Sequence, residues 1–299
     1  MFYRLRDEVR RARFEGACRA ILRTAPVTLD ATSGLALVSQ LQHKDVLMYM
    51  LAVKSFTKRV RASAVYVIDD GTLCAEDRAK LKDHVPQLTF LELAAFRSPA
   101  CPKGGCWERL LAISELVRSY YVIQLDSDTL TVGSVDEVRN AVEEGKAFAL
   151  GTWDKQKIET MRERSDTAKR VLPQGNDHIQ VLAEANFDKL ESFESLRYVR
   201  GCAGFAGFAR RSFERKFMEA ISTQMHAAIG ERWMEWGSEQ VMSNIVVANI
   251  TDAMVLPHPK YADCHKMKAG ITEFVHFIGS CRFLDGNYAR LGGQVISGL

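Results

Sequence analysis

The sequence predicts an α/β fold, in which helices flank a mostly parallel mixed sheet, and three observations support this prediction. Short apolar runs rich in β-forming residues alternate with stretches of helical spacing through the first half of the chain. Two of the apolar runs, residues 62–68 and 120–125, are followed closely by pairs of aspartates. The composition, 47% apolar and 26% charged over 299 residues, is typical of a globular protein with a large core.

Four strands that alternate with three helices are expected before residue 126. The expected strands are residues 34–41, 62–68, 88–93 and 120–125, and the expected helices are residues 43–58, 75–85 and 107–119. Strands that alternate with helices in this way form parallel pairs through right-handed crossovers. The first half of the chain is therefore expected to supply a doubly wound, largely parallel sheet.

The alternation is less regular in the second half of the chain. The expected elements there are helices over residues 135–144, 211–229 and 238–248 and strands over residues 146–153 and 274–277. Between them, residues 196–209 carry Gly201, Gly204 and Gly207, which suit either a close backbone approach or tight core packing. The polar stretch over about residues 154–195 is expected to be a variable insertion, as in a lid or a segment that contacts substrate.

The N-terminal segment differs from the rest in charge. Residues 1–23 hold seven arginines against three acidic residues, at helical spacing. We expect residues 1–30 to form an Arg-rich helical extension and residues 31–299 to form a single domain. The basic face of the extension is either solvated, with its apolar face packed on the domain, or in contact with an anionic membrane surface.

The sequence lacks several kinds of segment and motif, and these absences indicate where the protein is located and which partners it has. No apolar run is long enough for a signal-peptide core or a membrane span, so a cytoplasmic protein is expected, with peripheral contact at the inner face of the membrane as the alternative. Seven cysteines without close C-x-x-C pairs predict free thiols in a reducing compartment rather than a disulfide framework. The basic segment lacks interleaved aromatic residues or a known binding motif, so nucleic acid is not expected as a partner.

Asp126 and Asp128 are the strongest candidates for a functional site. They lie directly after the strand expected over residues 120–125, and ligands of open α/β sheets bind just beyond the carboxyl ends of strands. Two carboxylates this close repel each other unless a cation lies between them. Because oxygen ligands suit a hard divalent cation, the sequence predicts a metal site here.

Two further motifs make the chain resemble a known family. Arg109-Leu110 precedes the Asp-x-Asp by about one helix, and the segment from His276 to Arg282 has the form His-x-x-Gly-x-x-Arg. With these motifs in this order, the chain resembles the GT-A-fold, metal-dependent glycosyltransferases, nearest to the glycogenin-like and bacterial lipopolysaccharide hexosyltransferases. The resemblance covers roughly residues 34–283. It implies a Rossmann-like GT-A catalytic domain whose acceptor side carries the insertion at about residues 154–195.

The same resemblance implies a function and a set of ligands. The enzyme would move a sugar from a nucleotide-diphosphate-sugar donor, expected to be a UDP-sugar, to a saccharide, lipid-linked or other acceptor. Asp126, Asp128 and His276 would hold Mn²⁺ or Mg²⁺, and the imidazole among the ligands favours Mn²⁺. Gly279 would allow close backbone approach to the diphosphate, and Arg282 would supply it with a cation.

Five more residues are assigned by the resemblance. Asp69 and Asp70 would contact the uracil or the ribose, although Asp-Asp-Gly is also an ordinary turn signal. Arg109 would contact a phosphate or the donor sugar. Glu239 and Gln240 would lie beside the transferring sugar: Gln240 or a donor phosphate oxygen suits a retaining reaction, which the resemblance implies, whereas Glu239 would be the general base of an inverting one.

The chain also departs from the family pattern, and two other functions stay open. Cys202-Ala-Gly replaces the usual Asn-Ala-Gly, and Phe283-Leu284 replaces Pro-Trp. One alternative is a non-catalytic protein that binds nucleotide sugars or serves as a scaffold on the same fold. The other is a haloacid-dehalogenase-type phosphatase, whose two aspartates act as nucleophile and acid/base. That class places its motif at the first strand and follows it with Gly-Thr, unlike this chain.

Overall fold

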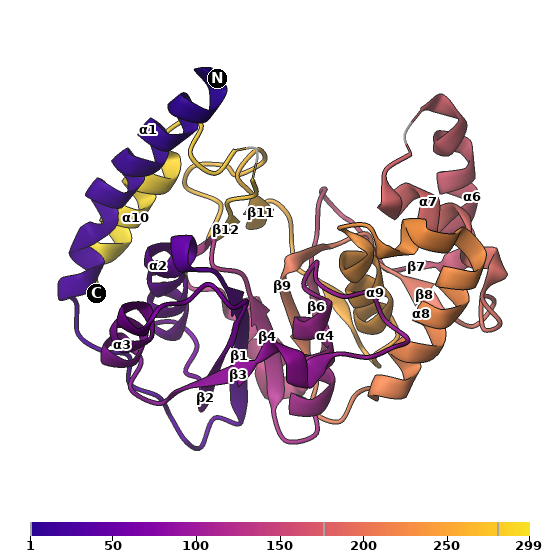
Figure 1. The fold of residues 1–299 in the computed structure, drawn as a ribbon, viewed down its shortest axis with the longest axis horizontal. Coiled ribbons are helices and arrows are strands. Elements are labelled where there is room, and N and C mark those ends of the chain that lie inside the picture. Colours follow the sequence, from indigo (N-terminus) through magenta and orange to yellow (C-terminus); the bar gives the residue numbers. More distant parts are fainter. Residues whose placement is uncertain (1, 176, 280) are drawn as a thin grey trace.

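A mixed sheet of seven strands, in the order β10-β6-β9-β4-β1-β2-β3, organises the protein (Figure 1). The computed structural model describes residues 2–175, 177–279 and 281–299. The strands of this sheet are β1 (Leu35–Leu41), β2 (Ala64–Asp69), β3 (Leu88–Glu92), β4 (Tyr121–Leu125), β6 (Phe148–Leu150), β9 (Cys202–Phe208) and β10 (Met254–Val255). β3, β2, β1 and β4 pair in parallel, which confirms the predicted α/β fold with a mostly parallel sheet.

Helices cover the sheet. The helices are α1 (Phe2–Cys18), α2 (Val46–Thr57), α3 (Ala75–His84), α4 (Trp107–Leu116), α5 (Asp136–Glu144), α6 (Met161–Val171), α7 (Ile179–Ala185), α8 (Arg215–Ile229), α9 (Ser238–Ala248) and α10 (Asn287–Ser297). α4 packs on β1 and β4, and α9 packs on β6 and β9. All side chains of β4 are buried, as expected of a central strand covered on both faces.

Strand β9 makes the sheet mixed, because it runs antiparallel to both β4 and β6. A Cβ atom on Gly207 would overlap the Phe148 ring, and one on Gly204 would overlap the His276 ring. Of the two explanations offered for these glycines, core packing therefore holds at Gly207. Close approach to a candidate site residue holds at Gly204.

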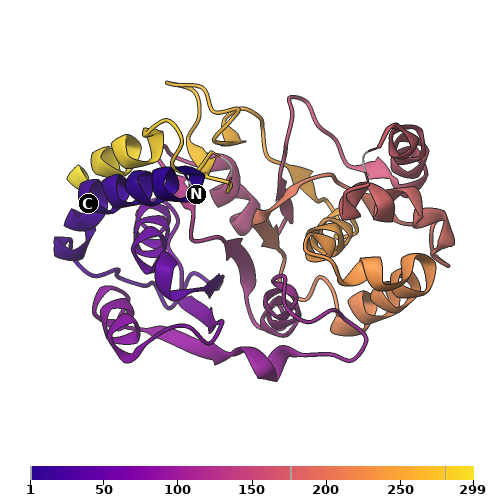
Figure 2. The same cartoon turned by 45° about the horizontal axis from the view of Figure 1, so that its top comes forward.

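Two smaller sheets accompany the large one. β12 (Phe274–His276) lies between β11 (Tyr261–Asp263), to which it is parallel, and β5 (Thr129–Thr131), to which it is antiparallel. β7 (Glu159–Thr160) and β8 (Arg197–Tyr198) form an antiparallel pair. β7, α6 and α7 belong to the stretch expected as an insertion, and α6 and α7 lie at the opposite end of the molecule from α1 and α10 (Figures 1 and 2).

The first and last helices of the structure, α1 and α10, lie side by side (Figures 1 and 2). Phe14 of α1 is only 2% exposed, and its ring centroid lies 4.3 Å from that of Tyr288 and 5.3 Å from that of Phe283. The apolar face of the Arg-rich helix is thus packed on its own chain. Among the described residues, no helix is both long and apolar enough to cross a membrane.

The expectation of free thiols is wrong for two cysteines, because Cys264 and Cys281 form a disulfide. Cys264 follows β11 and Cys281 lies five residues after β12. Since these strands are parallel neighbours, the segments that leave their carboxyl ends start close together. Their separation of 17 residues in sequence gave no sign of this proximity.

Phe14→Ala should lower the free energy of unfolding by about 3–5 kcal/mol, because it removes a buried aromatic ring between α1 and α10. The matched control is Val9→Ala on the same helix, where the side chain is exposed and the expected change is about 0.5 kcal/mol or less. Urea denaturation followed by circular dichroism measures both variants. Equal midpoints for the two variants would mean that α1 is not an integral part of the fold.

Candidate metal and diphosphate site

Asp126 and Asp128 lie where β4 ends and the chain turns into β5. The amide of Asp126 donates to the Gly204 carbonyl of β9 at 2.9 Å, so the first aspartate is still held by the sheet. The Thr129 amide and hydroxyl both donate to the Asp126 carbonyl, at 3.2 and 2.8 Å, and close a tight turn. This turn presents both carboxylates on the same side of the sheet edge.

His276 reaches the two aspartates through strand pairing. The register of β12 against β5 places His276 opposite Thr129. The Phe277 amide donates to the Asp128 carbonyl at 2.8 Å and extends this register by one residue. A residue 148 positions further along the chain is thereby fixed next to Asp128 by backbone hydrogen bonds alone.

The three side chains converge on one point. His276 Nε2 lies 3.1 Å from Asp128 Oδ1 and 3.8 Å from Asp126 Oδ2. One ligand atom from each residue lies within 4.8 Å of the others. On the other side of the ring, His276 Nδ1 is 3.2 Å from the Cys202 sulfur. Two carboxylate oxygens and an imidazole nitrogen thus face a common centre.

The outer oxygen of each aspartate contacts an arginine. Arg109 Nη1 donates to Asp126 Oδ1, and Arg282 Nη2 donates to Asp128 Oδ2. Arg109, a buried residue of α4, also lies 3.5 Å from the carboxylate of Glu239 at the start of α9. The guanidinium groups therefore orient the carboxylates and leave their inner oxygens directed at His276.

Burial and charge act in opposite directions on the pKa values of this group. Burial alone would raise the pKa of Asp128, but the charges of His276 and Arg282 outweigh it and lower the pKa to about 2. Burial would lower the pKa of His276, yet Cys202 and Asp128 raise it well above its usual value. For Glu239, burial dominates over the charge of Arg109 and raises the pKa to about 7.

These residues line a cavity of about 630 Å³. The predicted site residues on its wall are Arg109, Asp126, Asp128, Glu239, Gln240, His276, Gly279 and Arg282. Gln240 accepts a hydrogen bond from the Ala203 amide at 3.3 Å, which turns its carboxamide toward the glycine-rich strand β9. Eight of the ten predicted site residues thus meet at one cavity, although they come from four separate parts of the chain.

Asp69 and Asp70 are not among the described residues that line the cavity. Asp69, at the end of β2, pairs with Arg78 and accepts the Gly71 amide at 2.8 Å. Asp70 accepts both the amide and the hydroxyl of Thr72, at 3.0 and 2.6 Å. Their hydrogen bonds are those of an ordinary turn, and their role toward uracil or ribose stays a prediction.

The chemistry of the donor set fits a divalent cation. Two carboxylates with one imidazole are ligands suited to Mn²⁺, and the absence of a side chain at Gly204 makes room for the imidazole. The Cys202 sulfur occupies the position beside the second ring nitrogen, where partners commonly fix the orientation of a ligating histidine. The chemistry of the residues present therefore fits Mn²⁺ or Mg²⁺.

Many other residues of the cavity wall were not predicted from the sequence, among them Trp153, Arg200, Trp236 and Lys266. Trp153 and Trp236 are exposed, whereas the two remaining tryptophans of the chain are buried. Arg200 lies 3.2 Å from Glu184, which is buried in α7. No motif marks these residues.

Comparison with known proteins gives structural matches only. No protein-family model matches the chain, and no curated protein matches it by sequence. The apo structure of the WbbM bifunctional glycosyltransferase matches with a TM-score of 0.50 and 11% identity, over 85% of this chain and 47% of that one. The fold is of the GT-A type. This chain spans about half the length of the WbbM structure, and an identity this low is informative about the fold alone.

Two further structures resemble the chain more distantly. Core-mannan synthase A from Aspergillus fumigatus, in its Mn/GDP form, has 10% identity and a TM-score of 0.44 over 78% of this chain and 75% of that one. The galactosyltransferase LgtC, in complex with donor and acceptor sugar analogues, has 12% identity and a TM-score of 0.41 over 88% and 96%.

Gly204→Ala should displace His276 and weaken Mn²⁺ binding by about 10- to 100-fold, as the loss of ligand orientation does in other metal sites. The added Cβ would occupy the space of the imidazole, while the backbone of Gly204 lacks the positive φ that disfavours alanine. Gly293→Ala on α10, where nothing lies within 4 Å of the added atom, is the control. Titration calorimetry with Mn²⁺ measures both, and unchanged affinity in Gly204→Ala would contradict the assigned place of His276.

Glu184 should make folding stability fall between pH 5 and pH 8. Burial raises the pKa of Glu184 from 4.5 to about 7 in the folded chain, against the opposing charges of Arg200 and Arg164. The folded state therefore holds this proton more tightly than the unfolded state. The resulting stabilisation is complete below pH 4.5 and is lost as the pH rises through 7, by up to about 3 kcal/mol.

Glu184→Gln removes the titrating group and should flatten this part of the pH profile. Urea denaturation at pH 5, 6.5 and 8 compares the variant with the wild type. Glu143→Gln is the control, because that carboxylate is exposed on α5. A wild-type slope that survives in Glu184→Gln would assign the pH dependence to another group.

Proposed function

We propose that the protein is a metal-dependent glycosyltransferase that moves a sugar from a nucleotide-diphosphate-sugar donor to a saccharide, lipid-linked or other acceptor. The observation that carries the proposal is the convergence of Asp126, Asp128 and His276 at the wall of a cavity that also holds Arg109 and Arg282. Acidic ligands for a cation, beside arginines for phosphate, are what a nucleoside diphosphate requires. The GT-A fold is consistent with this use of the site.

Different residues of the chain would bind the cation and the diphosphate. Bound Mn²⁺, or Mg²⁺, would neutralise the diphosphate and so stabilise it as a leaving group. Asp126, Asp128 and His276 would hold the cation. Arg282, fixed by a 3.0 Å hydrogen bond from its Nε to the Phe277 carbonyl, would donate to a phosphate oxygen. Gly279 lies on the same wall and would let the backbone approach the diphosphate.

Glu239, Gln240 and Arg109 would surround the transferring sugar. Glu239 is 4% exposed and faces Arg109, so its carboxylate is poorly placed to take a proton from an acceptor. This arrangement favours the retaining outcome over the inverting one, with the Gln240 carboxamide or a donor phosphate oxygen near the reacting face. NMR of the newly formed anomeric centre distinguishes the two outcomes.

Two further proposals concern the identity of the donor and the location of the protein in the cell. A UDP-hexose is proposed as the donor on the resemblance of the sequence motifs, with Asp69 and Asp70 as candidates for contact with the uracil or ribose. Peripheral contact of residues 1–23 with an anionic membrane and a cytoplasmic location stay predictions of the sequence.

The phosphatase alternative fits the geometry less well. A phosphatase of that class needs one aspartate free to attack phosphorus. Here Asp126 and Asp128 each have one oxygen on an arginine and the other directed at His276. A scaffold protein that binds nucleotide sugars without turnover would use the same pocket, and the presence or absence of turnover distinguishes it.

Nucleotide binding should require the metal and Asp128. In a thermal-shift panel of UDP, GDP and CDP with Mn²⁺, Mg²⁺ or EDTA, we expect one nucleotide plus metal to raise the melting temperature by several degrees, as ligand binding to the folded state does. Asp128→Asn should abolish the shift. Asp136→Asn, an exposed carboxylate on α5, should retain it.

Turnover is measured on the same samples as metal-dependent release of nucleoside diphosphate from UDP-sugars. Release that is lost in Asp128→Asn supports the transferase, because transfer of the sugar to an acceptor or to water frees the nucleoside diphosphate. Binding without release in the presence of saccharide acceptors would support the scaffold. No metal-dependent shift with any nucleotide would refute the proposed donor site.

A further inference from the structure

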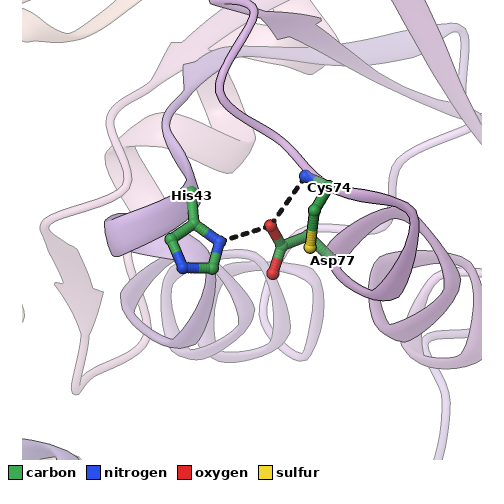
Figure 3. A group of neighbouring side chains, drawn as sticks. All are labelled: His43, Cys74 and Asp77. Carbon is green, nitrogen blue, oxygen red and sulfur yellow. Dashed lines mark hydrogen bonds and ion pairs between the residues drawn. The ribbon is translucent and has the colours of Figure 1, made fainter.

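A second group of metal-ligating side chains lies outside the cavity, where the segments that follow β1 and β2 meet (Figure 3). His43 begins a short 3-10 helix after β1, Cys74 immediately precedes α3, and Asp77 lies in the first turn of α3. Their ligand atoms lie within 4.8 Å of one another. We propose that His43, Cys74 and Asp77 form a Zn²⁺ site that is separate from the triad of Asp126, Asp128 and His276.

The carboxylate of Asp77 is the centre of the group. Its Oδ2 atom lies 2.5 Å from His43 Nδ1 and accepts the Cys74 amide at 3.0 Å (Figure 3). Ligand atoms around tetrahedral zinc are roughly 3.3–3.8 Å apart, given zinc–ligand bonds of about 2.0–2.3 Å. An ion inserted between these atoms would therefore move the side chains only slightly, and mainly by separating His43 from Asp77.

The donor set points to zinc rather than to a harder cation. A thiolate, an imidazole and a carboxylate together are ligands that Zn²⁺ accepts, whereas Mg²⁺ and Ca²⁺ prefer oxygen alone.

Two basic residues of α3 near Asp77 have other partners, whereas Arg19 and Lys44 line the neighbouring cavity with it. Arg78 pairs with Asp69, and Lys80 pairs with Glu76 at 2.6 Å. Both basic residues of α3 that flank Asp77 thus already have carboxylate partners. The attraction between Asp77 and an incoming ion is to that extent left intact.

The group is open to solvent on one side. His43 and Cys74 are exposed, while Asp77 is buried. A neighbouring cavity of about 460 Å³ is lined by His43 and Asp77 and also by Glu15 of α1. Three protein ligands leave a fourth position of zinc for water, as in sites that are not purely structural.

Helix capping explains only part of this arrangement. The pairing of the Asp77 side chain with the Cys74 amide is that of a capping box. Serine, threonine, aspartate or asparagine are the residues preferred before a helix, so capping does not require a thiol there. Capping also does not require an imidazole from another segment of the chain. A metal accounts for all three residue types together.

Zinc bound here would tie the end of β1 to the start of α3. His43 also donates its amide to Thr72 at 2.9 Å, in the segment that follows β2. Arg11 of α1 donates to the Lys44 carbonyl next to His43. The ion would therefore hold together three segments at one corner of the sheet, and it should stabilise the fold in proportion to its binding.

The test uses Co²⁺ as a coloured substitute for zinc on the intact chain. We expect one equivalent to produce a thiolate-to-cobalt charge-transfer absorption that Zn²⁺ displaces. Cys74→Ser should abolish the absorption. His43→Ala removes a proposed ligand and should weaken cobalt binding by at least about tenfold. The Cys202→Ser variant is the control, because Cys202 is a thiol in contact with His276 of the other candidate metal group.

The outcomes separate this inference from the proposed function. Asp128→Asn should keep the cobalt absorption but lose metal-dependent nucleotide binding. The zinc site and the donor site can therefore each be refuted alone. No thiolate absorption in the wild type, an absorption that survives Cys74→Ser, or one that disappears equally in Cys202→Ser would each overturn the zinc site.

Discussion

The pairing of β12 with β5 is the constraint on which the candidate site depends. β5 is only three residues long and follows directly on Asp128, so the strand that pairs with it is delivered to the end of β4. The antiparallel register then fixes His276 beside the two aspartates. Gly204 on β9 leaves the space that the imidazole fills. A site assembled from distant parts of the chain is thus held by short strands whose side chains are mostly buried.

Charge balance is the second requirement. Asp128 and Glu239 are buried carboxylates, and a buried charge without a partner is strongly destabilising. Arg109 and Arg282 supply the counter-charges from the outer side of the aspartates, which leaves the inner oxygens for a cation. A diphosphate would compete with the aspartates for these same guanidinium groups. A cation bound to the aspartates would release the guanidinium groups to the diphosphate. Cation and diphosphate would therefore stabilise the site together better than either does alone.

Local pattern was enough to predict much of the fold. The strand that ends at Leu125 and the helices on either side are set by apolar periodicity, and periodicity is a local property. Helix α10 was missed because Gly292 and Gly293 lower its helix propensity. The glycine at position 292 is explained only by packing on α1, because a Cβ atom there would overlap the Cys18 sulfur.

The disulfide was missed for a similar reason, because strand pairing and not sequence spacing brings its two cysteines together. Trp153 and Arg200 could not be assigned because a cavity wall has no local sequence pattern.

The central claim is that Asp126, Asp128 and His276 hold a cation that contacts the donor diphosphate. Pulsed electron paramagnetic resonance of bound Mn²⁺ tests it most directly, because it detects magnetic nuclei close to the metal. We expect a ¹⁴N coupling from the imidazole that is absent in His276→Asn, and a ³¹P coupling that appears when a nucleoside diphosphate is added. Bound Mn²⁺ without the nitrogen coupling, or without the phosphorus coupling at saturating nucleotide, would contradict the account.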